Sequence, residues 1–237
     1  MGGILLQLGE NSLPSIRAFG VGFITSTEWD PAMTQRFGAA SSMYGTLAST
    51  FIAMILAVPL SLVIALFLVE LAHPVLSRFV GYAIELLAAI PSIIYGMWGL
   101  FVFAPFMEKY IQIPLNEHFG FIPLFSGAPM GIGMLTAGVI LALMILPFVS
   151  AVMRDVFRMV PGVVQEAAYG MGSTTWEVTR RVTVRYGVQG LIGATFLGLG
   201  RAIGETMAVT FVIGNVHNIS ASLLAPGNSI ASTLANE

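Results

Sequence analysis

The chain has 237 residues, of which 56% are hydrophobic and only 9% are charged, and its mean hydropathy is +0.86. Soluble globular domains carry about 25% charged residues, and a chain of this length must cover most of its surface with groups that water tolerates. The composition therefore excludes a soluble enzyme and a disordered chain and predicts an integral membrane protein. The formal net charge of −2 gives no reason to expect nucleic acid as a partner, and the absence of cysteine removes disulfides, thiolate metal sites and cysteine nucleophiles.

The segment Met1–Leu8 is apolar but too short to span a bilayer, and it lacks the basic start of a signal peptide. We interpret it as the last turns of a helix that begins before this chain. Ala235, Asn236 and Glu237 end the chain in a segment after which a further span could follow. We therefore expect a chain truncated at both ends.

Three stretches without a charged residue lie between Arg36 and Glu70, between Glu85 and Glu108, and between Glu117 and Arg154. Each is longer than the roughly 20 apolar residues that a helix needs to cross a bilayer. Lipid does not solvate unpaired backbone groups, and no stretch shows the alternation of a barrel strand, so these spans are predicted to be helices. The predicted spans are 44–68, 80–103 and 132–153.

Two carboxylates and two prolines lie within or next to the first two spans. Glu70 and Glu85 lie near span ends, so we interpret both as solvated side chains that reach the membrane surface. Pro59 and Pro91 are predicted to kink their helices.

Residues 154–190 form a polar loop of mixed helical character. Pro161 is suited to a helix start and Gly172 to a helix end, so the pattern predicts a short helix, a turn and a second helix. The second helix carries Trp176, Val178 and Val182 on roughly one face. An amphipathic helix lying on the membrane and a docking helix for a partner both fit this pattern.

A fourth span, 191–214, is apolar except for Arg201 and Glu205 near its middle. These residues are spaced i and i+4, so a continuous helix would place them on one face, where they can pair. Charges at this depth are costly and usually face a bundle interior or a watery path, so a structural ion pair and a substrate contact are both open. The planar guanidinium of Arg201 can donate two hydrogen bonds at once, which suits a tetrahedral oxyanion. Gly200 and Gly204 permit close helix contact.

Basic residues set the expected orientation. Five arginines fall between the third and fourth spans, whereas the 104–131 connection has Lys109 alone. The positive-inside rule therefore predicts that 154–190 is cytoplasmic. Alternation then places 71–79 in the cytoplasm, and it places 1–43, 104–131 and the tail after Asn215 outside.

Within the loop, Glu166, Ala167 and Ala168, followed by Gly172 and, after nine further residues, by Val182, resemble the EAA loop of permease subunits from ABC importers. The resemblance implies a coupling helix that docks on a separate ATPase subunit. The family usually continues with an aliphatic residue and a proline, and this chain has Val184 and Arg185 there. That departure concerns the end of the second helix.

Three further segments are similar to the permease of bacterial phosphate ABC importers, of the PstC type: Gly198–Asn215 with its Gly-Glu-Thr-Met-Ala run, Glu85–Gly96, and Thr25–Pro31 with its Trp-Asp-Pro sequence. The similarity covers nearly the whole chain. It implies an all-α, polytopic transmembrane bundle with the type I permease fold of ABC importers, in one domain over 1–237, multi-pass in the bacterial inner membrane. It also implies inorganic phosphate as substrate, with a sister permease subunit, two cytoplasmic ATPase subunits and an external phosphate-binding protein as partners.

The resulting hypothesis is a phosphate permease subunit in which Arg201 and Glu205 line the substrate path, and Glu166, Ala167, Ala168 and Gly172 couple it to the ATPase. No catalytic residue, metal or cofactor is expected. A permease for sulfate or molybdate is the alternative. An intramembrane enzyme is a weaker one, because the spans lack paired Asp, a Ser with His, or a metal-binding His cluster.

Overall fold

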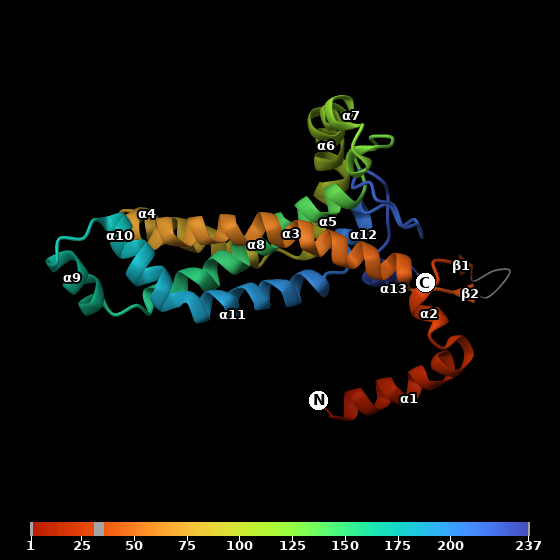
Figure 1. Ribbon diagram of the computed structural model, residues 1–237, viewed down its shortest axis with the longest axis horizontal. Coiled ribbons are helices and arrows are strands. Elements are labelled where there is room, and N and C mark those ends of the chain that lie inside the picture. The colour runs from red at the N-terminus through yellow and green to blue at the C-terminus, as the bar shows by residue number, and fades with distance from the viewer. Residues whose placement is uncertain (1, 31–35, 237) are drawn as a thin grey trace.

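The computed structural model describes residues 2–30 and 36–236, and this part of the chain consists almost wholly of helices (Figure 1). Its one sheet is a short hairpin in which β1 (Trp29–Asp30) pairs antiparallel with β2 (Arg36–Phe37). The predicted all-α class is confirmed. Met1, Pro31 and Glu237, which entered the sequence interpretation, lie outside the described residues.

Two long helices form the axis of the bundle. α3 (Ala40–Leu66) is continued by a π-helical segment over Phe67–Leu71, and α8 (Met134–Arg158) lies beside it. Both are long and apolar enough to cross a membrane. The first contains the predicted span 44–68, and α8 covers the predicted span 132–153 from Met134 onward. A helix is the form in which such segments satisfy every backbone group internally.

Small side chains allow α3 and α8 to pack closely. Buried residues recur at every fourth position of α3 on the face that meets α8, and all of them are small: Ser49, Ala53, Ala57, Ser61 and Ala65. Gly45, one turn earlier, is also buried but meets the backbone of Asn228. α8 supplies larger buried side chains, including Ile140, Leu141 and Ile145. In a membrane such a pairing is stabilised by close van der Waals contact. α8 is therefore the core helix of the chain.

The second predicted span, 80–103, is not one helix. α4 (Pro74–Ala88) is followed by α5 (Ser92–Trp98), which begins a helical run over Ser92–Phe119 that is bent by 87° relative to α4. Pro91 stands at the break and has an extended ψ of 135°. The helix is interrupted here because proline lacks the N–H that a continuing helix requires and disfavours helical geometry in the residue before it. The predicted kink at Pro91 is confirmed, and the predicted span 80–103 is broken there into two helical parts.

After α5 the helical path continues with further irregularity. A π-helical segment over Gly99–Phe103 is followed by α6 (Ala104–Met107), by another π-helical segment over Glu108–Gln112, and by α7 (Ile113–Phe119). A single 3₁₀ turn, Pro123–Phe125, then leads towards α8.

The fourth predicted span, 191–214, is also interrupted. α11 (Val184–Ile203) ends before Gly204, and α12 (Met207–Val212) begins after three non-helical residues. The loop before it is helical over α9 (Gly162–Gly170), α10 (Thr175–Val178) and a π-helical segment, Thr179–Thr183.

In Figure 1, α1 extends below the bundle, whereas α13 lies at the right-hand end of α3. α1 (Gly2–Phe19) and α2 (Gly22–Thr25) precede the hairpin, and α13 (Ile230–Asn236) packs on α3 and α12. α1 buries no residue, and it continues well beyond the apolar segment 1–8. In Figure 1, α9 and α10 lie at the opposite, left-hand end of the bundle from α7 and α13.

Candidate functional site

Arg201 and Glu205 lie on the two sides of the break between α11 and α12. Arg201 is in the last turn of α11, Gly204 follows the helix, and Glu205 precedes α12. Glycine weakens a helix at this point, and the Glu205 carboxylate Oε1 accepts a hydrogen bond from the Ala208 backbone N–H at 3.3 Å. The carboxylate thus satisfies a donor in the first turn of α12.

The expected ion pair between Arg201 and Glu205 does not form. Both residues are described, and no salt bridge joins them, because the helix ends before the i+4 position. The Arg201 guanidinium instead lies over the Phe148 ring of α8, 5.1 Å from its centroid. Within the described part of the chain, this half-buried cation has no carboxylate partner, so its hydrogen-bond donors are free to meet an anion.

Gly200 and Gly204 do not provide the helix contact expected of them. A side-chain carbon at Gly200 would meet nothing within 4 Å, and one at Gly204 would approach only the carbonyl oxygen of Gly200. Within this chain the two glycines therefore face away from the neighbouring helices.

Hydroxyl groups gather beside the break. Thr46, Ser49 and Thr50 of α3 line a small cavity together with Glu205 and Ser229. Its volume of about 10 Å³ is near the lower limit for one water molecule. The Thr50 hydroxyl is buried and has no hydrogen-bond partner among the described residues. A buried hydroxyl normally has a partner, so this donor is available to a small polar species.

The segment before and within α13 closes this side of the bundle. Ser42 and Thr233 hydroxyls lie 2.8 Å apart, and the Ile230 backbone N–H donates to the Thr46 hydroxyl at 3.0 Å. The Asn228 amide donates to the Thr233 hydroxyl at 3.0 Å. Sequence reasoning treated these residues only as part of a tail, although their run of Ser, Thr and Asn residues was visible in it.

The turn after α9 holds the predicted loop residues together. The Gly172 N–H donates to the Tyr169 carbonyl at 2.9 Å, and the Ser173 N–H donates to the Ala168 carbonyl at 3.2 Å. This is a Schellman motif, and Gly172 occupies its left-handed position with φ +87°. The predicted helix start at Pro161 and helix end at Gly172 are confirmed.

The same loop exposes apolar side chains at the end of the molecule. Val163, Met171 and Trp176 are 76%, 82% and 69% exposed. Glu166 and Ala167 are exposed as well, whereas Ala168 is buried. We name this surface, made of Val163, Glu166, Ala167, Met171 and Trp176, the α9 tip.

The sequence interpretation placed Trp176 and Val178 on one face. They do not share a face, because Val178 is fully buried whereas Trp176 is exposed. A capping box begins α10: the Thr174 backbone N–H and hydroxyl both donate to the Glu177 carboxylate at 3.0 Å. These hydrogen bonds, from the Thr174 backbone first and its side chain second, hold the pKa of the Glu177 carboxyl below its usual range.

Glu70 connects three elements and is not a merely solvated carboxylate. Its Oε1 accepts hydrogen bonds from the Gln165 amide of α9 at 3.1 Å and from the Thr183 hydroxyl at 2.8 Å. The Gln165 amide also donates to the Thr183 hydroxyl at 3.0 Å. The end of α3 is thereby tied to both helices of the loop. The signal in the sequence was a carboxylate at a span end with polar residues in the loop that follows the third span.

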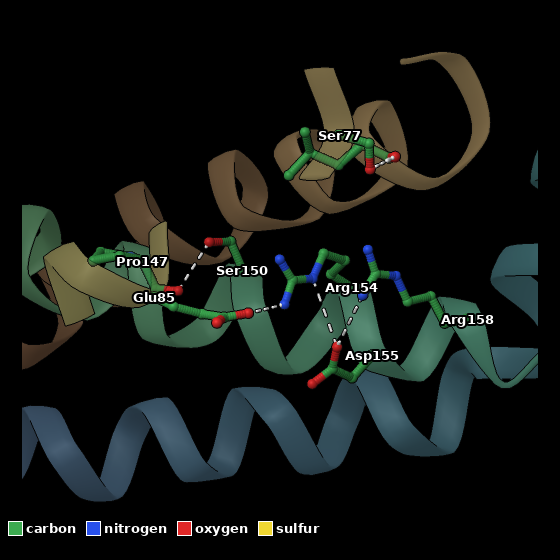
Figure 2. A network of polar contacts seen from close by, with 8 residues as sticks. Ser77, Glu85, Pro147, Ser150, Arg154, Asp155 and Arg158 are labelled. Carbon is green, nitrogen blue, oxygen red and sulfur yellow. Dashed lines mark hydrogen bonds and ion pairs between the residues drawn. The ribbon is translucent and has the colours of Figure 1, made fainter. Parts of the chain in front are cut away.

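Glu85 likewise has a partner. Its Oε1 accepts from Arg154 Nη2 at 2.5 Å, and Figure 2 shows this contact between α4 and the last turns of α8. Arg154 belongs to α8, so the loop begins one turn later than predicted. The Arg154 side chain is only 5% exposed, whereas that of Glu85 is 51% exposed. Within residues 2–30 and 36–236, no group of three His, Asp or Glu side chains could hold a metal ion.

The candidate residues thus form two separate sites. Arg201 and Glu205 flank the α11–α12 break, and Glu166, Ala167 and Gly172 lie at the α9 tip or its turn, at the far end of the bundle (Figure 1).

The sequence is similar to that of several known proteins of one family. No protein-family model matches the chain. The "Phosphate transport system permease protein PstC" of Pasteurella multocida (strain Pm70) is 54% identical over 238 residues, which is 99% of this chain and 74% of the relative. The protein of the same name in Mesorhizobium japonicum is 52% identical over 241 residues, which is all of this chain and 73% of the relative.

A more distant relative comes from an archaeon. The "Probable phosphate transport system permease protein PstC" of Methanocaldococcus jannaschii is 36% identical over 231 residues, which is 96% of this chain and 73% of the relative. These relatives are named as transport components rather than enzymes, in agreement with the prediction. The chain belongs to the PstC family of phosphate transport system permease proteins.

Proposed function

We propose that this chain is a membrane-spanning permease subunit of an ATP-driven phosphate importer and that Arg201 contacts phosphate in the translocation path. The relatives' names support phosphate as the substrate. Transporters commonly build substrate sites at breaks in membrane helices, because irregular backbone at that depth is tolerated only where it is buried or lines a cavity. The α11–α12 break is such a feature.

This proposal depends on the position of the Arg201 guanidinium and on its lack of a carboxylate partner. The guanidinium is half-buried at the break and has no carboxylate partner in the described part of the chain. A guanidinium keeps its charge at every relevant pH and can donate two parallel hydrogen bonds to a phosphate. Glu205 caps α12 beside the hydroxyl-lined cavity and so fixes the geometry of the break.

The test is uptake of labelled phosphate by the reconstituted complex with Arg201→Gln and Arg201→Lys. We expect assembly of both variants and loss of uptake in Arg201→Gln. Arg201→Lys keeps the charge without the two-pronged geometry, so uptake should fall at least tenfold, as expected for a lost interaction of about 1.4 kcal/mol or more.

Phe148→Leu is the matched control, because it removes the ring under the guanidinium and keeps Arg201. We expect it to retain most of the uptake. Full phosphate uptake by Arg201→Gln would exclude Arg201 as a substrate contact. Parallel assays with labelled sulfate and molybdate address the alternative substrates.

Coupling is assigned to the α9 tip. We infer that it docks on a cytoplasmic ATPase subunit, because its exposed Val163, Met171 and Trp176 are costly to leave in water. The hydrogen bonds of Glu70 to Gln165 and Thr183 join this loop to α3, so a movement of the tip is passed to a helix that lines the cavity beside Glu205. Glu166 is exposed on the tip and is available to a basic group of the partner.

The remaining parts of the assembly follow from this function. A sister permease subunit would complete the path, two ATPase subunits would supply the energy, and an external phosphate-binding protein would deliver the substrate. We propose that the complex resides in the bacterial inner membrane, with the α9 tip in the cytoplasm and 104–131 outside. The 1–237 chain then acts as one permease domain.

A further inference from the structure

A second polar pocket lies between α4 and the last turns of α8, apart from the α11–α12 break. Its volume is about 360 Å³, and its lining includes Ser77, Arg78, Tyr82, Glu85, Arg154 and Arg158. We name it the arginine pocket. The transport function proposed above assigns no role to it.

Helical spacing brings these side chains together. Arg78, Tyr82 and Glu85 are spaced i, i+4 and i+7 in α4, and Arg154 and Arg158 are spaced i and i+4 in α8. Such spacings place residues on one helix face. Because α4 packs on α8, the two faces enclose one volume.

Arg154 is built into the wall of this pocket. Its side chain is 5% exposed, and it is held through Nη2 by Glu85 (Figure 2). A side-chain carbon on Gly81 of α4 would collide with Arg154 Nη1, so a glycine there leaves room for the guanidinium. Arg154 Nε makes no hydrogen bond, and its nearest carboxylate oxygen, from Asp155, is 3.6 Å away. A buried guanidinium therefore belongs to the pocket lining, and within the described residues the one carboxylate closer than 3.6 Å to it is that of Glu85.

The lining carries more positive than negative charge. Arg78 has no ion pair among residues 2–30 and 36–236, and Arg158 reaches a carboxylate only at 4.0 Å, on the exposed Asp155. Glu85 is the one carboxylate in the lining, and it already binds Arg154. The pocket is thus electrostatically unbalanced in a way that an anion would correct.

We propose that the arginine pocket binds a phosphate-type oxyanion, either free inorganic phosphate or the phosphodiester headgroup of an anionic lipid. Planar guanidinium groups on two helices can surround a tetrahedral anion with charge-assisted hydrogen bonds, and the Tyr82 hydroxyl can add a neutral one. Glu85 serves as the counter-ion of Arg154 when the pocket is empty and competes with the incoming anion. The pocket lies at helix ends, where both a membrane headgroup and a free ion have access.

The test uses the permease assembled with its partner subunits in nanodiscs, in an Arg201→Gln background that removes the proposed transport contact. The pocket variant carries Arg78→Gln and Arg158→Gln, both exposed positions that do not disturb Arg154. The matched control carries Arg180→Gln and Arg185→Gln, which remove the same charge from exposed positions outside the pocket.

Two arms separate the sources of the anion. In phosphatidylcholine nanodiscs, binding of labelled inorganic phosphate is measured by equilibrium dialysis. In nanodiscs containing phosphatidylglycerol, native mass spectrometry counts the anionic lipids that stay bound. Compared with the Arg201→Gln parent, we expect the pocket variant to bind at least tenfold less labelled phosphate in the first arm or to retain at least tenfold less phosphatidylglycerol in the second. The control should bind as much of each as the parent does. Loss in the first arm identifies free phosphate, and loss in the second identifies the lipid.

Glu85→Gln provides a second, opposite readout. It removes the competing carboxylate, so anion binding in the same arm should tighten several-fold. Equal binding by the pocket variant and the control in both arms, or no tightening in Glu85→Gln, would overturn the proposal. Because Arg201 is already replaced, these results are independent of the transport site.

Discussion

Gly96 lies where α5 crosses α12, and the closeness of that crossing depends on its missing side chain. An added side-chain carbon would lie 2.8 Å from Phe211 Cδ2, 3.0 Å from the Ala208 Cα and 3.1 Å from the Met207 carbonyl oxygen. Two of these three atoms belong to the backbone, so they cannot move aside independently of α12. At the residue scale, the position of α12 beside the break is set by one small residue on another helix.

We therefore predict that Gly96→Ala destabilises the protein by about 1–3 kcal/mol, the usual cost of overpacking, and lowers phosphate uptake because α12 shifts. Thermal unfolding of the purified protein and uptake by the complex measure the two effects. Gly193→Ala is the control, because Gly193 is helical and nothing lies within 4 Å of the added carbon. Equal behaviour of the two variants would show that the crossing does not constrain α12.

At the scale of elements, breaks rather than straight helices position the functional residues. Pro91 separates α4 from α5, and Gly204 is the first residue of the gap between α11 and α12. The second break takes Glu205 away from Arg201 and makes its carboxylate a cap for α12. The third such feature is the Schellman turn at Gly172, which orients α9 relative to α10.

The role of this turn can be tested with two neighbouring glycines. A side-chain carbon at Gly170 or at Gly172 would meet nothing within 4 Å, but only Gly172 has a positive φ, of +87°. Gly172→Ala should therefore cost about 1–2 kcal/mol of backbone strain, whereas Gly170→Ala should not.

We predict that Gly172→Ala lowers the ratio of phosphate uptake to ATP hydrolysis in the reconstituted complex, because the α9 tip is reoriented on its ATPase partner. Gly170→Ala should leave the ratio unchanged. Normal coupling in both variants would favour the alternative in which the loop helix merely lies on the membrane.

At the scale of the whole molecule, the α9 tip and the 104–131 connection lie towards different ends of the bundle (Figure 1). The long helices α3 and α8 between them have the length and hydropathy of membrane spans. The proposed orientation rests on the five arginines of residues 154–190, two in the last turns of α8 and three in the loop and α11 after it, which the positive-inside rule retains in the cytoplasm.

The chain has no cysteine, so single introduced thiols report sidedness without interference. Met171 and Phe121 are 82% and 81% exposed, one on the α9 tip and one in the 104–131 connection. Met171→Cys should react with an impermeant maleimide only from the cytoplasm, and Phe121→Cys only from outside. Labelling of both from one side would contradict the proposed topology and the docking of the α9 tip on a cytoplasmic ATPase.

The sequence by itself determined the membrane class, the all-α fold, two of the long helices and the turn at Gly172. These properties depend on local chemistry: lipid does not solvate backbone groups, and particular residues start or end a helix. The PstC resemblance, confirmed by the relatives, likewise followed from contiguous motifs.

Only the tertiary structure decided which charged groups meet. Arg201 and Glu205 were expected to pair but are separated by a break, whereas Glu85 and Arg154 pair although they are far apart in the chain. Glu70 binds both helices of the loop for the same reason. Such contacts depend on where helices end and how they cross, and a linear pattern of hydropathy and charge carries no information on the distance between two helices.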